Sequence, residues 1–379
     1  MKRFSLLICL IMTLCFCTSC GGSGGSGGGN AKTNANHTVI DKDGTVHHYA
    51  DESTEKVLKI FNWGDYINTD EDVLGKFAEK TGYKIIYDTF DTNESMYAKL
   101  KADPTGYDVI FPSDYMAKRM IEEGYVSKLD FDNIPNIDKI DKKFMGLSYD
   151  PNDEYTVPYM WGTLGILYNK EMVKEPIKSW DILWDKKYAK QIFMLDSSRD
   201  SIAVALKKLG YSLNTTDPDE LAAAKAELIK QKPLVLAYLC DEIKDKMLNS
   251  EAALALSFAG NALEVVLEEP DLLGYVIPED DGTNWFVDVV CVMESSKHKK
   301  TAEEFINFLC ETEIATENCD YIRYSTPQTE ALEEMKEIDY EFATNPYAFP
   351  EDVSNMELYI SSDEINKKYD RLWLEVKAK

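Results

Sequence analysis

Short apolar runs alternate with helical segments from residue 57 onward, and this alternation constrains the fold more than any other feature. Three of the runs have the length and composition of strands: Val57–Asn62, Lys84–Asp88 and Tyr107–Phe111. Between them, Glu71–Lys80 and Ser95–Lys101 carry helical periodicity. Strands that are joined through helices pair in parallel, so the sequence predicts an α/β fold with a parallel sheet.

A second set of such elements follows the apolar passage Tyr155–Tyr168. This passage contains Pro158 and Gly162 and lacks helical periodicity, which indicates an extended crossover. The later elements are predicted as strands at 191–195, 234–238, 253–258 and 287–293, and as helices at 201–208, 219–230, 302–309 and 364–377.

The folded region is too long for a single hydrophobic core. Roughly 325 residues follow the polar N-terminal segment, and single cores stop growing near 250–300 residues. We therefore expect two α/β lobes, one formed by 55–158 with 289–326 and the other by 159–288 with 327–379. Pro158, Gly162 and the strand that leads into Val287 are the expected hinges.

The N-terminus has the pattern of an export signal. Lys2 and Arg3 precede the uncharged apolar stretch Ser5–Phe16, which is too short for a membrane span, so 1–19 is predicted as a signal peptide. The run Cys17-Thr18-Ser19-Cys20 resembles a bacterial lipobox and predicts Cys20 as the lipidated first residue. The glycine–serine run that follows suits a flexible tether over 20–54. An ordinary cleaved signal followed by an incidental cysteine remains the alternative.

Charge and cysteine content narrow the class of partner. The net charge of −26 repels nucleic acid and anionic lipid and attracts cations. The cysteines after Cys20 show no zinc-ligand spacing, and neither a metal nor a cofactor is expected. A Cys310–Cys319 disulfide stays open. The histidines of the N-terminal segment are expected to be solvated rather than metal-bound: His37, His47 and His48.

Aromatic and acidic residues stand where the strands end. In open α/β sheets, ligands bind outside the carboxyl ends of the strands. The residues at those ends and beside the late strand are Trp63, Asp65, Tyr66, Ser113, Tyr115, Asp196, Ser197, Asp200, Trp285, Phe286 and Asp288. No GxSxG, HExxH, Walker A or GxGxxG motif accompanies them.

Such a set of residues matches a flexible chain of ammonium groups. Carboxylates replace water around each ammonium, and aromatic faces cover the methylenes and add cation–π attraction. Asp200 and Asp288 lie far apart in the sequence and could hold different ammonium groups. An aspartate in a loop also serves as a helix N-cap, which is the alternative for Asp200 and Asp196. These residues alone predict a binding protein for a cationic solute.

The sequence resembles the polyamine-binding proteins of ABC importers, the spermidine/putrescine-binding family, over about Val57–Ala378. The segments that carry the resemblance are FNWGDYI at 61–67, NESMYAKLK at 93–101, YDVIFPSDY at 107–115, VPYMWGT at 157–163, SWDILW at 179–184, LKKLGYSLNTTDP at 206–218 and YSTPQ at 324–328. The resemblance implies the type II fold of periplasmic binding proteins, with two α/β lobes that close on a ligand held between them.

The family pattern also implies the ligand-binding positions. They are Trp63, Asp65, Tyr66, Ser113, Tyr115, Asp200, Phe286, Asp288 and Tyr324. Four positions depart from the pattern: a carboxylate becomes Ser197, tryptophans become Phe258 and Phe286, and a glutamine becomes Tyr359. If the alignment is shifted by one residue, Trp285 rather than Phe286 stacks on the ligand.

The resemblance, the N-terminal signal and the negative charge together imply a monomeric, extracytoplasmic lipoprotein that binds spermidine or putrescine, with no nucleic-acid partner. It would be anchored through its lipid and deliver the solute to the permease and ATPase components of an ABC importer. One alternative keeps the fold with another solute, such as a thiamine-like compound, an amino-acid derivative, an opine-like compound or a metal complex. The other is a surface hydrolase that uses two of Asp196, Asp200 and Asp288 as a carboxylate pair.

Overall fold

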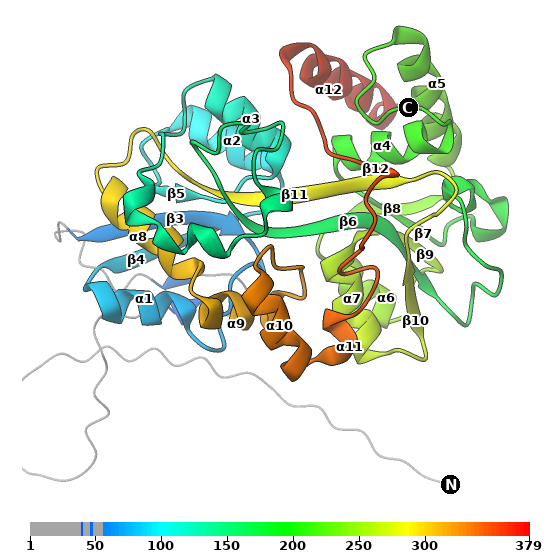
Figure 1. Ribbon diagram of the computed structural model, residues 1–379. Helices are drawn as coiled ribbons and strands as arrows, with labels where there is room; N and C mark the ends of the chain where they lie inside the picture. Colours follow the sequence, from blue (N-terminus) through cyan, green and yellow to red (C-terminus); the bar gives the residue numbers. More distant parts are fainter. Residues whose placement is uncertain (1–38, 41–45, 48–55) are drawn as a thin grey trace, which may run out of the picture. The chain divides into compact units, whose positions relative to one another are not determined.

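The computed structural model describes residues 39–40, 46–47 and 56–379. The predicted signal peptide, Cys20 and the tether over 20–54 lie outside the described residues, apart from two strands paired antiparallel, β1 (Val39–Ile40) and β2 (Val46–His47). In the rest of the chain, parallel strands and helices alternate as predicted (Figure 1).

The first strand set consists of β3 (Val57–Trp63), β4 (Lys84–Phe90) and β5 (Val109–Ile110). Both neighbours of β3 run parallel to it, in the order β4-β3-β5. The connecting helices are α1 (Val73–Thr81) and α2 (Asn93–Ala102), and α3 (Asp114–Glu122) follows β5. The carboxyl ends of these strands therefore meet at one edge of the sheet.

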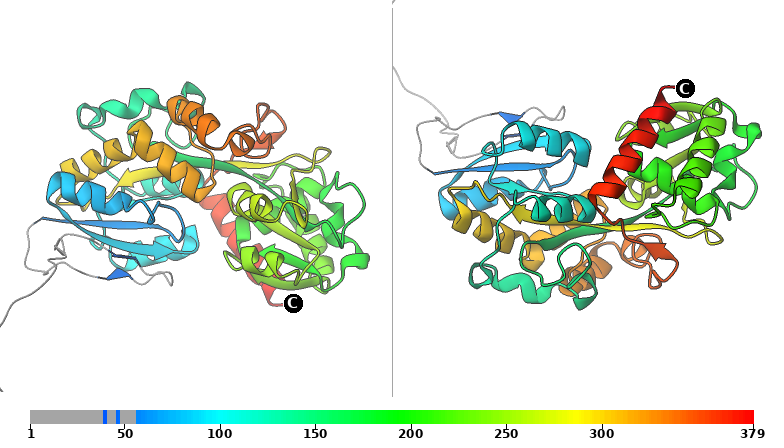
Figure 2. Two further views of the ribbon diagram at one scale, coloured as in Figure 1. Left: turned by 90° about the horizontal axis from the view of Figure 1, so that it is seen from below. Right: turned by 90° about the horizontal axis from the view of Figure 1, so that it is seen from above.

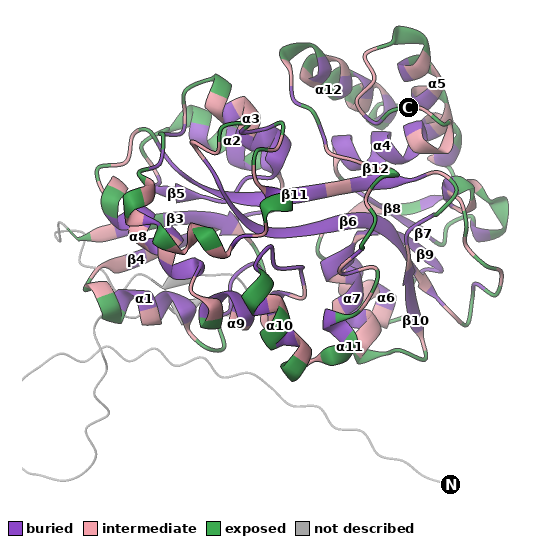
Figure 3. Cartoon of the chain, in the orientation of Figure 1, coloured by how far each residue is buried: buried purple, intermediate pink, exposed green. Residues whose placement is uncertain are grey.

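Two long strands, β6 (Val157–Asn169) and β11 (Thr283–Val292), join the first strand set to the second. They pair antiparallel with each other. Strand β11 also pairs with β5, and β6 also pairs with β9. Both are buried along nearly their whole length (Figure 3). The register shifts between Asp288 and Val289, and such bulges bend a strand and re-aim its side chains.

The second strand set consists of β7 (Ile192–Leu195), β8 (Val235–Leu239) and β9 (Leu254–Phe258), with β7 parallel to both others. A further strand, β10 (Leu273–Val276), pairs with β6. Its helices are α4 (Ser198–Lys208), α5 (Pro218–Gln231), α6 (Ile243–Leu248) and α7 (Ala259–Glu268).

The remaining elements follow β11 along the chain. They are α8 (Lys299–Leu309), α9 (Thr312–Ile322), α10 (Thr329–Ile338), α11 (Tyr340–Ala343), β12 (Met356–Glu357) and α12 (Asp363–Lys377), and β12 pairs with β11. Short 3-10 helices lie at Phe131–Asn133, Pro135–Lys139, Lys142–Phe144, Trp180–Trp184 and Lys186–Tyr188. Helix α10 packs on α9, whereas α12 shares a core with α4 and α5, beside which it lies in Figure 2.

One local prediction is corrected at the start of α4. The helix begins at Ser198, three residues earlier than the predicted 201–208, and Ser197 is its N-cap, with a hydroxyl that accepts from the Asp200 backbone N–H. Asp200 therefore lies in the first helical turn and does not cap the helix. The capping alternative for Asp196 is wrong for the same reason.

The cysteines of the described region are free, so the disulfide left open between Cys310 and Cys319 does not form. The Cys319 thiol instead contacts the Tyr324 carbonyl at 3.2 Å. Within the part of the chain that the structure describes, each helix is too short or too polar to cross a bilayer.

Candidate ligand-binding site

A cavity of about 980 Å³, its open mouth included, lies among the strand ends of both sets. Six carboxyl side chains line it: Asp65, Asp91, Glu94, Asp200, Asp241 and Asp288. Seven aromatic side chains join them: Trp63, Tyr66, Tyr115, Phe258, Phe286, Tyr324 and Tyr359. Lys244 supplies the basic side chain among the described lining residues.

Side-chain hydroxyl groups hold both carboxylate oxygens of Asp288. This residue follows Phe286 on the same face of β11, next to the bulge, and is 4% exposed. Its two oxygens accept from the Tyr66 hydroxyl and the Ser113 hydroxyl, each at 2.6 Å. Burial raises the pKa of Asp288 to about 6, against the lowering effect of these two hydrogen bonds, and the charge of Asp200 adds to the rise.

The Ser113 hydroxyl binds this carboxylate instead of capping a helix. Ser113 holds the N-cap position of α3, yet its side chain makes no capping hydrogen bond. Its hydroxyl donates to Asp288 and accepts from the Asn93 side-chain amide at 3.1 Å, while the Ser113 N–H donates to Asn93 Oδ1. The ends of β5 and α2 thus hold a side chain of β11 in place.

A second carboxylate group lies at two helix N-termini. Asp200, in the first turn of α4, accepts from the Tyr359 hydroxyl at 2.8 Å, and Glu94, in the first turn of α2, accepts from Tyr115 at 3.0 Å. Burial raises the pKa of both carboxyls, and for Glu94 the charge of Asp200 adds to the rise. The positive ends of the helix dipoles favour the ionised forms.

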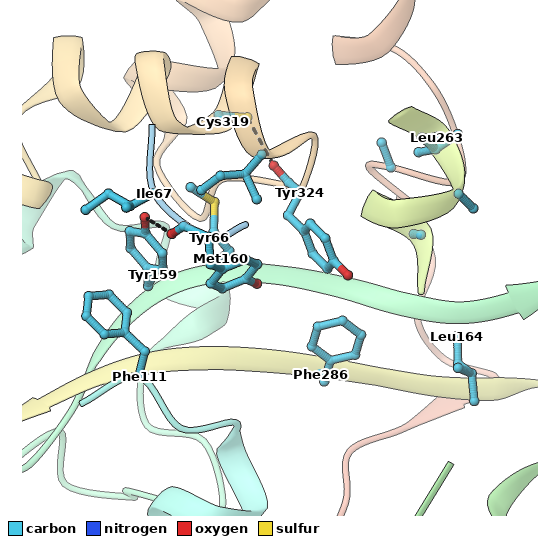
Figure 4. Packing of buried hydrophobic residues seen from close by; sticks show 14 of the residues in the cluster. Tyr66, Ile67, Phe111, Tyr159, Met160, Leu164, Leu263, Phe286, Cys319 and Tyr324 are labelled. Atoms are coloured by element: carbon cyan, nitrogen blue, oxygen red, sulfur yellow. Dashed lines mark hydrogen bonds between the residues drawn. The ribbon is translucent and has the colours of Figure 1, made fainter. Parts of the chain in front are cut away.

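The aromatic wall depends on two glycines. A Cβ on Gly162 would lie 2.9 Å from the Phe286 ring, and one on Gly260 would lie 1.9 Å from the Tyr324 ring. Because glycine lacks a Cβ, the Phe286 ring can pack against the backbone of β6 and the Tyr324 ring against that of α7. Figure 4 shows the two rings near each other beside the long strands, with centroids 6.3 Å apart. Phe258 meets Phe286 edge-on at 5.5 Å.

Comparisons with known proteins agree with this geometry. The family model described as bacterial extracellular solute-binding protein matches residues 72–349. The spermidine/putrescine-binding periplasmic protein of Salmonella typhimurium is 33% identical over 330 residues, which is 86% of this chain and 93% of the relative. This chain belongs to the bacterial extracellular solute-binding protein family.

Solved structures place this solute-binding protein in the same fold. The spermidine/putrescine ABC transporter substrate-binding protein of Streptococcus pneumoniae is 36% identical with a TM-score of 0.73, over 86% of this chain and 99% of the other. A lipoprotein of Treponema pallidum is 28% identical with a TM-score of 0.77, over 85% and 100%. The predicted fold class is confirmed, and membership in this family rejects the hydrolase alternative.

The solute-binding protein brings every predicted site residue of the described region to the cavity except Trp285. Successive residues of a strand face opposite ways, so Trp285 lies on the other face of β11 from Phe286. Its ring packs against Trp161 and Phe144, with centroids 6.4 and 6.5 Å away. Trp285 is therefore not part of the cavity wall, and Phe286 is the ring beside Asp288.

Two charged residues that stand beside predicted site positions lie outside the cavity. Asp196 accepts from the Lys377 ammonium at 2.8 Å. The Arg199 guanidinium is buried behind the wall, 4.6 Å from the Tyr359 ring centroid and 5.5 Å from that of Tyr115. Arg199 thus supports two aromatic residues of the wall from behind and leaves the cavity itself acidic.

Sequence reasoning missed several lining residues: Asp91, Asn93, Glu94, Asp241, Lys244 and Asn284. Asn93 and Glu94 open the segment 93–101 that carries the family resemblance, and that segment could have pointed to them. Asn284 donates its amide hydrogens to the carbonyls of Trp285 and Glu357, so its Oδ1, which has no partner in the described chain, is a free acceptor. No local pattern marks Asp241 or Lys244, because α6 is a short helix without a motif.

Proposed function

We propose that this solute-binding protein captures a polyamine of the spermidine/putrescine type and delivers it to an ABC importer. The observation that carries the proposal is the cavity wall, where six carboxyl groups and seven aromatic rings surround one space. The one basic residue of the described lining, Lys244, is itself paired with carboxylates.

The chemistry of the wall suits an ammonium chain. Each terminal ammonium donates three hydrogen bonds, and each oxygen of Asp288 already accepts one from a hydroxyl and has a further lone pair for a ligand. Burying an unpaired cation is strongly unfavourable, so carboxylates must face each ammonium. An anionic solute would instead meet several carboxylates and no free cation in the described wall.

The relatives support the same solute class, since those from Salmonella typhimurium and Streptococcus pneumoniae are named as spermidine/putrescine-binding proteins. Lipid attachment at Cys20 belongs to the proposal. It is supported by the lipobox-like run and by the similarity to a lipoprotein of Treponema pallidum.

Ligand-dependent closure also belongs to the proposal. The lobes would comprise 55–158 with 289–326 and 159–288 with 327–379, and they would move about β6 and β11 near Pro158, Gly162 and Val287. Support comes from the strand order, in which β6 and β11 make the continuous link between the two strand sets. The cavity is lined from both sets, so closure would enclose a solute.

Calorimetric titration of amine-free protein with putrescine and with spermidine tests the proposal. We expect saturable binding of at least one amine, and none of γ-aminobutyrate or thiamine at the same concentrations. Mass spectrometry of gently purified protein should find a co-purified amine. Absence of heat and of any thermal shift with both amines would overturn the assignment, and binding of thiamine alone would favour the alternative solute class.

A further inference from the structure

Lys244 places an ammonium group of the protein itself in the wall of the cavity. It is the second residue of α6, and its side chain is 16% exposed. The Nζ atom lies 3.3 Å from Asp65 Oδ2, on the loop after β3, and 2.9 Å from Glu264 Oε2, on α7. Lys244 therefore links the first strand set to helices of the second.

The exposed carboxyl groups of the cavity wall are called the mouth group: Asp65, Asp91 and Asp241. A Cβ on Gly64 would lie 3.5 Å from the Asp241 carboxylate, so the turn before α6 approaches the loop after β3 closely. Asp241 keeps much of its surface in solvent, yet desolvation by the surrounding walls raises its pKa, the Lys244 charge opposes this rise, and Asp65 and Asp91 add to it. These carboxyls therefore interact with one another and with Lys244.

Asp288, Asp200 and Glu94 form a separate inner group. The charge of Asp200 acts on both of the other carboxyls, and hydroxyl groups are the side-chain donors to all three. The Tyr324 ring packs 5.2 Å from the ring of Tyr66, which donates to Asp288, and its hydroxyl donates to Asn261 on α7, the helix whose Glu264 holds Lys244. Tyr324 thus connects the inner group to the helix that holds Lys244. The cavity thus has two acidic groups, and a lysine of the protein occupies only one of them.

A diamine and a triamine meet this arrangement differently. The inner group offers three carboxylates, which suffices for the two ammonium groups of a diamine. The third ammonium of a triamine would extend past Tyr324 toward the mouth group. There it would meet a like charge and would have to displace Lys244 from Asp65 and Glu264.

We propose that Lys244 determines the solute specificity of this site: its ammonium occupies the subsite that the third amino group of a triamine requires, so the protein binds diamines more tightly than triamines. The inference rests on the proposed polyamine function and names the class of amine that the site takes.

Titration of four proteins with putrescine and spermidine tests the inference. The wild type should bind putrescine more tightly than spermidine. Lys244→Met should raise the affinity for spermidine relative to putrescine by about tenfold or more, since it removes a like charge from the path of the third ammonium. Lys244→Arg retains the charge and should retain the preference. Lys246→Met is the matched control, because Lys246 lies on the same helix, pairs with Glu251 and does not line the cavity.

Each result decides between the two proposals. If neither the wild type nor any variant binds either amine, the proposed polyamine function is refuted. If the wild type binds both amines but prefers spermidine, the function stands and the role of Lys244 is refuted. Equal changes in both affinities on Lys244→Met would show a structural tie between α6 and the loop after β3, which also refutes it. If Lys244→Met does not fold, Lys244→Gln replaces it under the same criteria.

Discussion

Asp288→Asn should make the amine-free protein more stable while weakening its affinity for amines. The folded protein raises the pKa of this carboxyl from 3.8 to about 6, which corresponds to a cost of about 3 kcal/mol at pH 7.5. Asparagine keeps the shape and removes the charge. It also replaces one acceptor by a donor, so the Tyr66 or Ser113 hydroxyl must turn, at a cost of about 1–2 kcal/mol.

The net gain of about 1–2 kcal/mol should raise the melting temperature of the amine-free protein by about 2–6 °C. The gain depends on pH with a defined sign. Above pH 6 the folded wild type carries the full cost of the buried charge. Between pH 6 and the ordinary pKa of 3.8 the folded state binds a proton that the unfolded state lacks, so this cost disappears as the pH falls. The variant should therefore lose its advantage as the pH falls below 6, and near pH 4 its melting temperature should drop below that of the wild type, because the hydrogen-bond cost of about 1–2 kcal/mol remains.

Affinity should change in the opposite direction. Removing one partner of a buried, hydrogen-bonded charge pair costs about 2–5 kcal/mol, which corresponds to a loss of about 30-fold to several thousand-fold. The assays are differential scanning calorimetry of protein that has been unfolded and refolded to remove bound amines, and titration calorimetry with putrescine.

Asp196→Asn is the matched control. It makes the same chemical change at a carboxylate that pairs with Lys377 outside the cavity, so affinity should not change. A lower melting temperature for amine-free Asp288→Asn at pH 7.5, or an affinity equal to that of the wild type, would refute the reasoning.

Three further predictions follow from the same geometry. Amine affinity should be nearly constant above pH 7 and fall by about tenfold for each pH unit below about 6, because the Asp288 carboxyl must lose its proton to pair with an ammonium; a flat profile to pH 5 in titration calorimetry would contradict this. Phe286→Ala should weaken amine binding by about 0.5–2 kcal/mol. Trp285→Ala should instead lower the melting temperature and leave affinity unchanged, and the reverse pattern would place the stacking ring at Trp285. Gly260→Ala should cost about 1–3 kcal/mol of stability and weaken binding, because the new Cβ would overlap the Tyr324 ring; unchanged affinity and melting temperature would show that this ring moves freely.

The elements of the fold could largely be predicted, because strands and helices follow local periodicity. The strand predicted at Val57–Asn62 is β3 with one residue more, and the helix predicted at 364–377 is α12 with one residue more. Helices α7, α9 and α10 were missed, although the buried residues of α10, Ala331 and Met335, stand one helical turn apart. The strand predicted at Tyr107–Phe111 is shorter in the structure, where it is the two-residue strand β5. Only these two central residues pair with β3 and β11.

The placement of aromatic and acidic residues at strand ends was fixed by the sequence, since a strand end follows from its apolar run and parallel strands bring such ends together. The partners of those residues were decided only by tertiary structure. Tyr66 reaches Asp288 over 222 positions of sequence, and Lys244 reaches Asp65 over 179. The bulge beside Asp288 and the face of β11 that Phe286 occupies also depend on pairing with β6. Contacts of this kind arise from how distant elements pack, and no local pattern of residues encodes them.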